Sequence, residues 1–465
     1  MKAKLTVKKT FLLFVCLPYQ MVLSQTYANV PESSSLKEYS YRQMSDTSKK
    51  AVSPTGTQPA QNKSFIVTAE LRPRAEFRYG YRQLRADSSE PAYFVNQRTR
   101  FNITYKTDKL ILHTSIQDIR LYGQTGQFSV NGTIGMFEAY AEPVLAKNLS
   151  LRIGRQRLAI DNDRLFSAAN WAQASRAHEG IQFIYANTKL TTDLVGAFSQ
   201  EKENIFGTDF SPTANNNYKI LGVHNLKYKF SDAFALTTIT ATDAFENKTN
   251  KKVLYLRATS GGRVEFTKKA LYVTVAGYYQ YGTSPDGKEI AAYYIQPELQ
   301  IKINKLTTRL GAEYMTGDDA TQASNIYKSF IPLYGVAWKF MGNMDYFTAF
   351  PSNTKNGGLN NPYLFLIYDV NNRLSLRADG HLFLTQNKVL NKNKEVIDPY
   401  LGFENDLSFR IKFNEYTTWD FGFSYMIATK SMETIKGGNT AHTPIWSYTM
   451  ITFNPVLFNS SNKNK

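Results

Sequence analysis

The sequence predicts an all-β protein, a transmembrane antiparallel β-barrel of eighteen strands. Three observations lead to this prediction. Between residues 65 and 455, strand-like runs of roughly ten to fifteen residues alternate apolar and polar side chains. Every second gap between these runs is only a few residues long, and the remaining gaps are long and polar. Short periplasmic turns and long extracellular loops are typical of barrels in the bacterial outer membrane.

The alternation is clearest near the end of the chain. Trp419, Phe421 and Phe423 are separated by polar residues such as Asp420 and Ser424. Because successive side chains of a strand point to opposite faces, we expect the first set to face lipid and the second to face the lumen. The runs are longer than the five or six residues usual in globular proteins, which favours a barrel over a soluble sandwich.

The number of strands depends on one long segment. If residues 317–358 form a single loop, the count is eighteen, and if 331–340 and 345–351 are also strands, it is twenty. Both numbers are even, as single-chain bacterial barrels require. Neither short segment sustains the alternation, so we favour eighteen strands, which enclose an aqueous lumen.

Composition supports the same fold class. The chain has 465 residues and a negative mean hydropathy, with no apolar run of the roughly 18 residues that a spanning helix requires. Only alternate residues of a barrel strand meet lipid, so low hydropathy is expected. The 30 Tyr and 30 Phe residues suit barrel walls and interfacial girdles.

The ends of the chain are expected to lie outside the barrel. Residues 1–24 are predicted to be a signal peptide, because lysines precede a short apolar run and Ser24 offers a cleavage site; cleavage after Ala28 is the alternative. The only cysteine, Cys16, lies in this segment without a small residue just before it, which disfavours lipidation. The predicted domains are therefore the signal peptide 1–24, a disordered periplasmic extension 25–63, the barrel 64–455 and a polar C-terminal tail 456–465.

The charge of the chain indicates the kind of partner. The formal net charge is +17, and it is +13 without the four lysines of the predicted signal peptide. A basic soluble protein would suggest nucleic acid, but we expect none for an exported chain. The expected partners are an anionic polysaccharide or small anionic solutes, together with outer-membrane lipid.

The sequence contains no recognisable catalytic or metal-binding pattern. The five histidines show no ligand spacing, and no serine lies in a nucleophile-elbow motif. The acidic run Asp161-Asn162-Asp163 lacks the rest of a calcium-binding loop. We therefore expect no enzymatic activity, no metal site and no cofactor.

Several segments resemble the alginate export family of outer-membrane porins in their order and spacing. They are 96–102 (NQRTRFN), 116–120 (IQDIR), 153–158 (IGRQRL), 161–166 (DNDRLF), 330–335 (FIPLYG), 342–347 (GNMDYF) and 378–383 (ADGHLF). The resemblance implies a monomeric eighteen-stranded barrel that passes an anionic polysaccharide through an arginine-lined pore. The chain departs from the family pattern at Trp338-Lys339-Phe340, where we expect a histidine-containing segment.

Arginines are the predicted pore-lining residues. A guanidinium group binds carboxylates bidentately, and a polyuronate carries one carboxylate per sugar, so a ladder of arginines could pass it along the lumen. The arginines expected to contact the solute are Arg72, Arg74, Arg98, Arg100, Arg120, Arg152, Arg257 and, from a long loop, Arg176. The same strand faces carry acids, so the alternative that an arginine only braces the wall stays open for each of them.

The long segment 317–358 is the predicted gating loop. Segments of this length are usually functional or disordered, and this one contains four glycines after Gly317. Folded inward, it would narrow the pore and offer flat aromatic faces to sugar rings; the alternative is a surface loop. The residues with this predicted role are Tyr334, Trp338, Tyr346 and Phe347.

Together these features predict a passive outer-membrane channel with anion preference. Two alternatives are a general diffusion porin for small acids or sugars and a surface-binding barrel whose loops bind a partner. The sequence gives no direction of transport, because a passive channel follows whatever gradient the cell maintains.

Overall fold

The computed structural model describes residues 63–461 except 128–133, 201, 208–217, 248–249, 251 and 338. The predicted signal peptide, all but the last residue of the predicted extension and the predicted gating residue Trp338 lie outside the described residues. The described residues belong to one compact unit, Thr57–Lys465.

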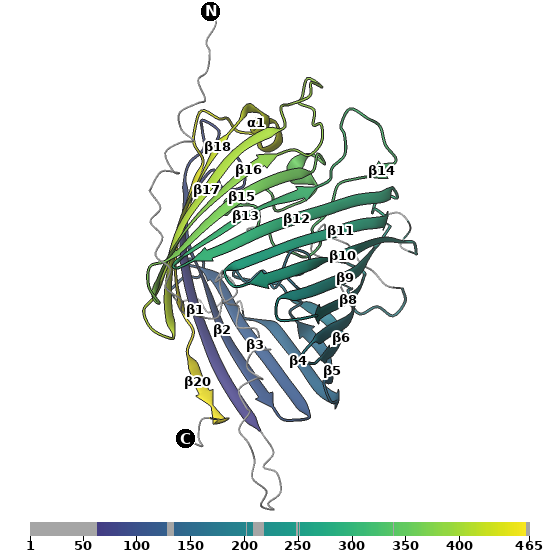
Figure 1. The fold of residues 1–465 in the computed structure, drawn as a ribbon, viewed down its shortest axis with the longest axis vertical. Helices are drawn as coiled ribbons and strands as arrows, with labels where there is room; N and C mark the ends of the chain where they lie inside the picture. Colours follow the sequence, from purple (N-terminus) through teal and green to yellow (C-terminus); the bar gives the residue numbers. More distant parts are fainter. Residues whose placement is uncertain are drawn as a thin grey trace, which may run out of the picture. The chain divides into compact units, whose positions relative to one another are not determined.

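Eighteen antiparallel strands form a closed barrel, because each strand pairs with its neighbours and the last barrel strand, β19, pairs with β1 (Figure 1). The barrel strands are β1 (Ser64–Tyr79), β2 (Ala92–Lys106), β3 (Leu110–Leu121), β4 (Gly135–Ala146), β5 (Leu149–Gln156), β6 (His178–Ala186), β7 (Leu190–Phe198), β8 (Ile220–Lys229), β9 (Phe234–Glu246), β10 (Leu254–Lys268), β11 (Leu271–Thr283), β12 (Glu289–Ile303), β13 (Leu306–Met315), β15 (Leu359–Asp369), β16 (Leu374–Leu384), β17 (Tyr400–Lys412), β18 (Thr417–Ala428) and β19 (Ile445–Phe453).

Four further elements within the described ranges lie outside this closed set of strands. They are β14 (Ile326–Tyr327), η2 (Ser352–Thr354), α1 (Lys430–Lys436) and β20 (Val456–Asn459). After Pro455, β20 continues the closing strand along the start of β1, where Phe458 pairs with Val67. The tail predicted to begin at residue 456 therefore begins with a short strand and not with an irregular polar segment.

The predicted strand count of eighteen is confirmed. Residues 331–340 and 345–351 contribute no barrel strand, and β13 pairs directly with β15 across the long segment between them. The short connections contain residues with positive φ that suit two-residue turns, such as Asn148, Lys269 and Asn304. All short turns lie at one end of the barrel, here called the short-turn end, and the long loops lie at the opposite, long-loop end.

The two faces of each strand differ in polarity, and β12 shows this most clearly. Gln296, Glu298 and Gln300 are buried on the inner face, whereas Ile295 and Leu299 are exposed on the outer face. This inversion of the usual pattern is expected for a wall surrounded by lipid. No helix within the described ranges is long and apolar enough to cross a membrane.

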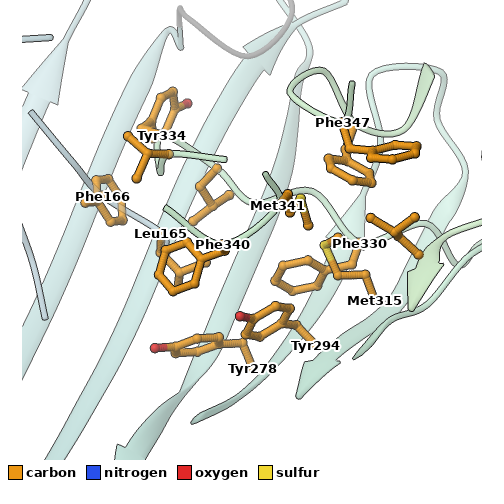
Figure 2. Packing of buried hydrophobic residues seen from close by; sticks show 14 of the residues in the cluster. Leu165, Phe166, Tyr278, Tyr294, Met315, Phe330, Tyr334, Phe340, Met341 and Phe347 are labelled. Atoms are coloured by element: carbon orange, nitrogen blue, oxygen red, sulfur yellow. The ribbon is translucent and has the colours of Figure 1, made fainter. Parts of the chain in front are cut away.

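The hydrophobic core lies inside the barrel and not between layers of sheet. Residues of the long segment between β13 and β15 pack against the inner face of the wall (Figure 2). Phe330 lies against Tyr294 of β12, with ring centroids 5.4 Å apart. The lumen is therefore partly filled by the chain's own loops.

Gly154 in β5 occupies a position where a larger residue would strain the wall. Gly154 has a φ of +126°, and a Cβ at this position would clash with the carbonyl oxygen of Ala139 on β4. Gly154→Ala should lower the free energy of unfolding by about 1–3 kcal/mol, measured by urea unfolding in detergent micelles with tryptophan fluorescence. Gly196→Ala is the control, because no atom lies within 4 Å of its added Cβ. Equal stability of the two variants would contradict the prediction.

Candidate functional site

Two loops from the long-loop end join inside the barrel. We call residues 157–177 and 316–358 together the inner plug. Phe166 and Tyr334 form a parallel β-bridge between the two loops. The Tyr334 N–H donates to the Leu165 carbonyl oxygen at 2.9 Å, and the Ser167 N–H donates to the Tyr334 carbonyl oxygen at 3.1 Å. The loops therefore behave as one hydrogen-bonded unit.

A buried ion pair attaches the inner plug to the wall. Arg164 contacts Glu313 of β13 at 2.8 Å, and these two side chains are 1% and 0% exposed. The same guanidinium donates to the Val336 carbonyl oxygen at 2.9 Å, so it links both loops to the wall. The rings of Tyr294 and Phe340 lie 5.4 and 5.1 Å from it. A buried charge is costly unless it is fully paired, so this contact fixes the position of the plug.

A second arginine of the first loop holds the second loop. Arg176 donates to the carbonyl oxygens of Tyr334 and Gly335. Position 335 requires glycine, because a Cβ there would clash with the Arg164 carbonyl oxygen. Burial lowers the pKa of Arg176, yet a guanidinium remains charged at physiological pH. Its positive charge is bound here by carbonyl groups and not by a carboxylate.

The far end of the plug is clamped from two sides. Glu404 and Asp406 of β17 accept hydrogen bonds from the backbone N–H groups of Met344 and Asn343, at 2.8 and 3.1 Å. From the β1–β2 loop, the Arg82 N–H donates to the Met344 carbonyl oxygen at 3.0 Å. The plug therefore reaches across the lumen from one wall to the other.

The three predicted gating residues that the structure describes are buried. Tyr334, Tyr346 and Phe347 are at most 1% exposed. The Tyr334 hydroxyl donates to Asp243 at 2.8 Å, and the Phe347 ring centroid lies 4.7 Å from that of Phe383. The segment folds inward, which was one of the two predicted positions. The prediction that these three rings offer free faces to sugars is wrong, because packing covers the faces.

Arginines of β1 and β2 bind the inner plug through its backbone and one hydroxyl. Arg72 donates to the Asn170 carbonyl oxygen at 2.9 Å, and Arg74 donates to that of Trp171 at 2.9 Å. Arg98 and Arg100 both donate to the Ser175 hydroxyl, at 2.8 and 3.2 Å. These four predicted pore residues are therefore brought together on one wall, where they face the segment 170–175.

This wall has more positive than negative charge. Its inward-facing arginines outnumber its inward-facing glutamates by three. Glu76 forms ion pairs with two of these arginines, and Glu70 pairs mainly with Arg98. The arginines are Arg72, Arg74, Arg78, Arg98 and Arg100, and the glutamates are Glu70 and Glu76.

On other strands, several inward arginines each have a carboxylate partner. Each of several inward arginines contacts a carboxylate within 2.7 Å: Arg152 with Glu142, Arg257 with Asp243, Arg309 with Glu298, Arg377 with Asp379 and Arg410 with Asp420. Arg152 and Arg257, predicted to contact the solute, thus have the geometry of the bracing alternative.

Arg120 occupies the opposite face from the one predicted. The register pairs it with Gln97, which alternates with the inward-facing Arg98. Its guanidinium binds Asp118, which lies on the same outward row. Arg120 was predicted on the inward row and lies on the outward row, at the long-loop end of β3, where charged residues are tolerated on the outer face. At this end of the strand it also lines the cavity described next.

A cavity of about 420 Å³ lies where the basic wall meets the inner plug. Five arginines line it, namely Arg74, Arg78, Arg82, Arg120 and Arg176. Among its described lining residues, the only carboxylate is that of Asp345. Arg82 and Asp345 could not be predicted as lining residues, because loop residues have no strand alternation from which a direction can be inferred.

Three residues that line this cavity interact with one another. Arg82 and Asp345 form an ion pair at 3.0 Å. Burial and the Asp345 carboxylate raise the pKa of Tyr81, which therefore stays a neutral donor to Asp345. Within the described part of the chain, no group of three or more His, Cys, Asp or Glu residues could hold a metal ion. The described lining of the cavity has more cationic than anionic side chains.

A closed eighteen-stranded barrel with an apolar outer wall and a charged, loop-filled interior defines an outer-membrane barrel protein. The family match and the porin structures given next identify it as a channel and not an enzyme. The family described as alginate export matches residues 63–429, and the chain belongs to that family. No curated protein matches the sequence as a relative.

Solved outer-membrane proteins share the fold. OccAB4 of Acinetobacter baumannii superposes with a TM-score of 0.59 at 13% identity, covering 85% of this chain and 99% of that one. OccK5 (OpdH) of Pseudomonas aeruginosa gives a TM-score of 0.55 at 10% identity, covering 85% and 98%. OpdK of the same species, solved with vanillate, gives 0.56 at 10% identity, covering 84% and 98%. At these identities the similarity establishes the fold alone.

The buried ion pair yields a prediction about stability. Arg164→Met leaves the Glu313 carboxylate buried without its cation, which should lower the free energy of unfolding by about 3–5 kcal/mol. The double variant Arg164→Met/Glu313→Gln should recover part of this loss. Arg410→Met is the control, because its side chain is 25% exposed and its loss should cost less. An unchanged urea midpoint for Arg164→Met in detergent micelles would refute the role of the pair.

A lysine in α1 yields a prediction about pH. Lys436 donates to the Tyr346 carbonyl oxygen and lies 5.3 Å from the Phe347 ring centroid. Burial, with a smaller contribution from Arg82, lowers the pKa of Lys436 to about 7. The clamped plug therefore binds fewer protons than a state with Lys436 in water, so clamping should strengthen as pH rises from 7 to about 10.

Single-channel recording at pH 6, 8 and 10 measures this effect as the fraction of time in the lower-conductance state. The fraction should rise with pH in the wild type and should respond less in Lys436→Gln. Lys430→Gln is the matched control on the same helix, because its side chain is 80% exposed. Equal pH responses in both variants would exclude Lys436 as the titrating group.

Proposed function

We propose that this outer-membrane channel prefers anions and passes an acidic polysaccharide such as alginate. The observation that supports the proposal is the uncompensated positive charge of the β1–β2 wall, next to the cavity lined by Arg78, Arg82 and Arg176. Family membership supports the polysaccharide as the solute.

The chemistry of the wall suits carboxylates. Guanidinium groups stay charged at all physiological pH values and present two parallel N–H donors to a carboxylate. Rings and ladders of arginine are a known means of anion selectivity in pores. Arg72, Arg74 and Arg78 follow one another along the inner face of β1, which spans about 20 Å between the first and last of them. Residues 170–175 cover Arg72 and Arg74, so Arg78 is the member of this row that a polymer carboxylate would contact, while Arg72 and Arg74 add to the positive field.

The channel is proposed to act passively and as a monomer. The barrel closes on itself between β1 and β19, and the basic wall, the plug and the cavity all come from one chain. No second copy is required to complete the site.

A channel for small organic acids is the second candidate. The solved OpdK structure contains vanillate, which is a carboxylate. The cavity of about 420 Å³ falls in the size range of small-molecule pockets.

Reversal potentials in planar bilayers under a salt gradient test the anion preference. Arg78→Gln removes one positive charge and leaves Arg74 paired with Glu76, so the anion-to-cation permeability ratio should fall roughly two- to threefold. The matched control is Arg377→Gln on β16, four strands from β1 around the barrel, where Arg377 pairs with Asp379 and is similarly exposed. Its ratio should change less. A non-selective wild type would reduce the protein to a general diffusion porin.

Polymer added to one side separates the two candidates. Polymannuronate should block the wild-type current in a voltage-dependent manner, and Arg78→Gln should weaken the block. Block by small carboxylates without block by the polymer would favour the second candidate.

A further inference from the structure

A groove of about 520 Å³ lies on the outer, lipid-facing wall across β13 and β15–β18. The lipid-facing side chains around it are apolar or aromatic. In one lateral row the register places Leu366, Ala378 and Leu407 side by side, so the small Ala378 forms a floor between two larger side chains. Such a groove in the hydrocarbon zone fits an acyl chain.

The groove lies near the periplasmic end of the barrel. Its lower row pairs Leu306, the first residue of β13, with Tyr368, the next-to-last residue of β15. Leu376 continues the row only two residues after β16 begins. At about 3.3 Å per residue, the groove starts within roughly 10 Å of the turns that face the periplasm.

These periplasmic turns carry an excess of cations. Counting each short turn with the last residue of the preceding strand, every one of the eight turns contains at least one exposed lysine or arginine. The ten cations are Lys106, Lys109, Lys147, Lys189, Lys229, Lys268, Lys269, Lys305, Arg373 and Lys412, and the four acids are Asp108, Asp232, Asp369 and Glu415.

Three of the cations gather below the groove. Lys305 donates through Nζ to the Val370 carbonyl oxygen at 2.6 Å, which places it against the β15–β16 turn that contains Arg373. The Lys412 backbone N–H donates to the Arg373 carbonyl oxygen at 2.8 Å. The nearby Asp369 is already paired with Lys302 at 3.3 Å. The cations therefore remain available to an anion at the membrane boundary.

We propose that this wall binds an anionic phospholipid of the periplasmic leaflet. One acyl chain lies over Ala378, and the headgroup phosphate lies against Arg373, Lys412 and Lys305. An apolar groove in the hydrocarbon zone and cations at its aqueous edge match the two parts of such a lipid. Tyr368 stands at the boundary between them, as aromatic side chains do at membrane interfaces. The proposed site is separate from the lumen, and its role would be to bind anionic phospholipids in preference to neutral ones.

Native mass spectrometry of the full chain tests the proposal. The protein is released from micelles that contain equal amounts of phosphatidylglycerol and phosphatidylcholine, and the retained lipid is identified. The wild type should retain phosphatidylglycerol preferentially. Arg373→Gln/Lys412→Gln should lower that retention at least severalfold and abolish the preference. Ala378→Phe, which fills the groove on the lipid-facing side, should reduce the retention of both lipids.

The control variant removes two cations from the opposite wall. Lys147→Gln/Lys189→Gln changes two neighbouring turns joined by the hydrogen bond from the Ala186 N–H to the Asn148 carbonyl oxygen. It should keep the wild-type preference. If both double variants lost the preference for phosphatidylglycerol equally, the lipid would be attracted to the cations of all the turns, and the proposal of a specific site would be overturned. Absence of any preference in the wild type would overturn it as well.

Conductance separates this proposal from the function of the pore. The lipid-site variants should keep wild-type conductance and ion selectivity, because none of their residues contacts the cavity. Heat-modifiable mobility on gels confirms that each variant forms a folded barrel. Loss of lipid preference with an intact channel, or the reverse, can therefore be assigned to one proposal.

Discussion

The structure depends on one constraint: no backbone N–H or C=O group can remain unpaired in lipid. The wall meets it by closing β19 onto β1, from Arg74 opposite Met450 to Tyr79 opposite Ile445. Closure with eighteen strands creates a lumen too wide to be filled by the wall's own side chains. The chain fills part of this space with the inner plug, whose polar backbone then needs partners of its own. Arginines and acids of the inner wall supply them, so the charges inside the barrel follow from the same requirement that closes it.

The interior divides its arginines between two tasks. On most of the wall each arginine has a carboxylate, as Arg309 has Glu298, and such pairs contribute structure without net charge. On β1 and β2 the partners are mainly carbonyl and hydroxyl oxygens of residues 170–175, which satisfy hydrogen bonds without neutralising charge. Rigid attachment of the plug and a positive field in the lumen are therefore properties of the same side chains.

The fold could be predicted from the sequence because lipid and water impose a period of two on every strand. The roles of individual arginines could not. Arg257 was given the correct face, but its pairing with Asp243 depends on the register between β9 and β10, which alternation alone does not determine. Arg120 was misplaced because outward residues near a strand end no longer meet hydrocarbon. The burial of Tyr334 depends on its bridge to Phe166 of another loop, for which no local pattern exists.

The seam of the barrel has a consequence for assembly. Glu76 of β1 accepts a hydrogen bond from the indole of Trp446, 370 residues away in the chain. The Phe65 backbone N–H donates to the Ser460 hydroxyl, 395 residues away. Contacts of such separation form late, because the entropy of closing the connecting loop must be lost before they contribute. One edge of β1 therefore stays unpaired until nearly the entire chain has reached the membrane. During that interval the exposed edge can pair with other chains, so protection against aggregation has to come from the cell's assembly factors and not from the fold itself.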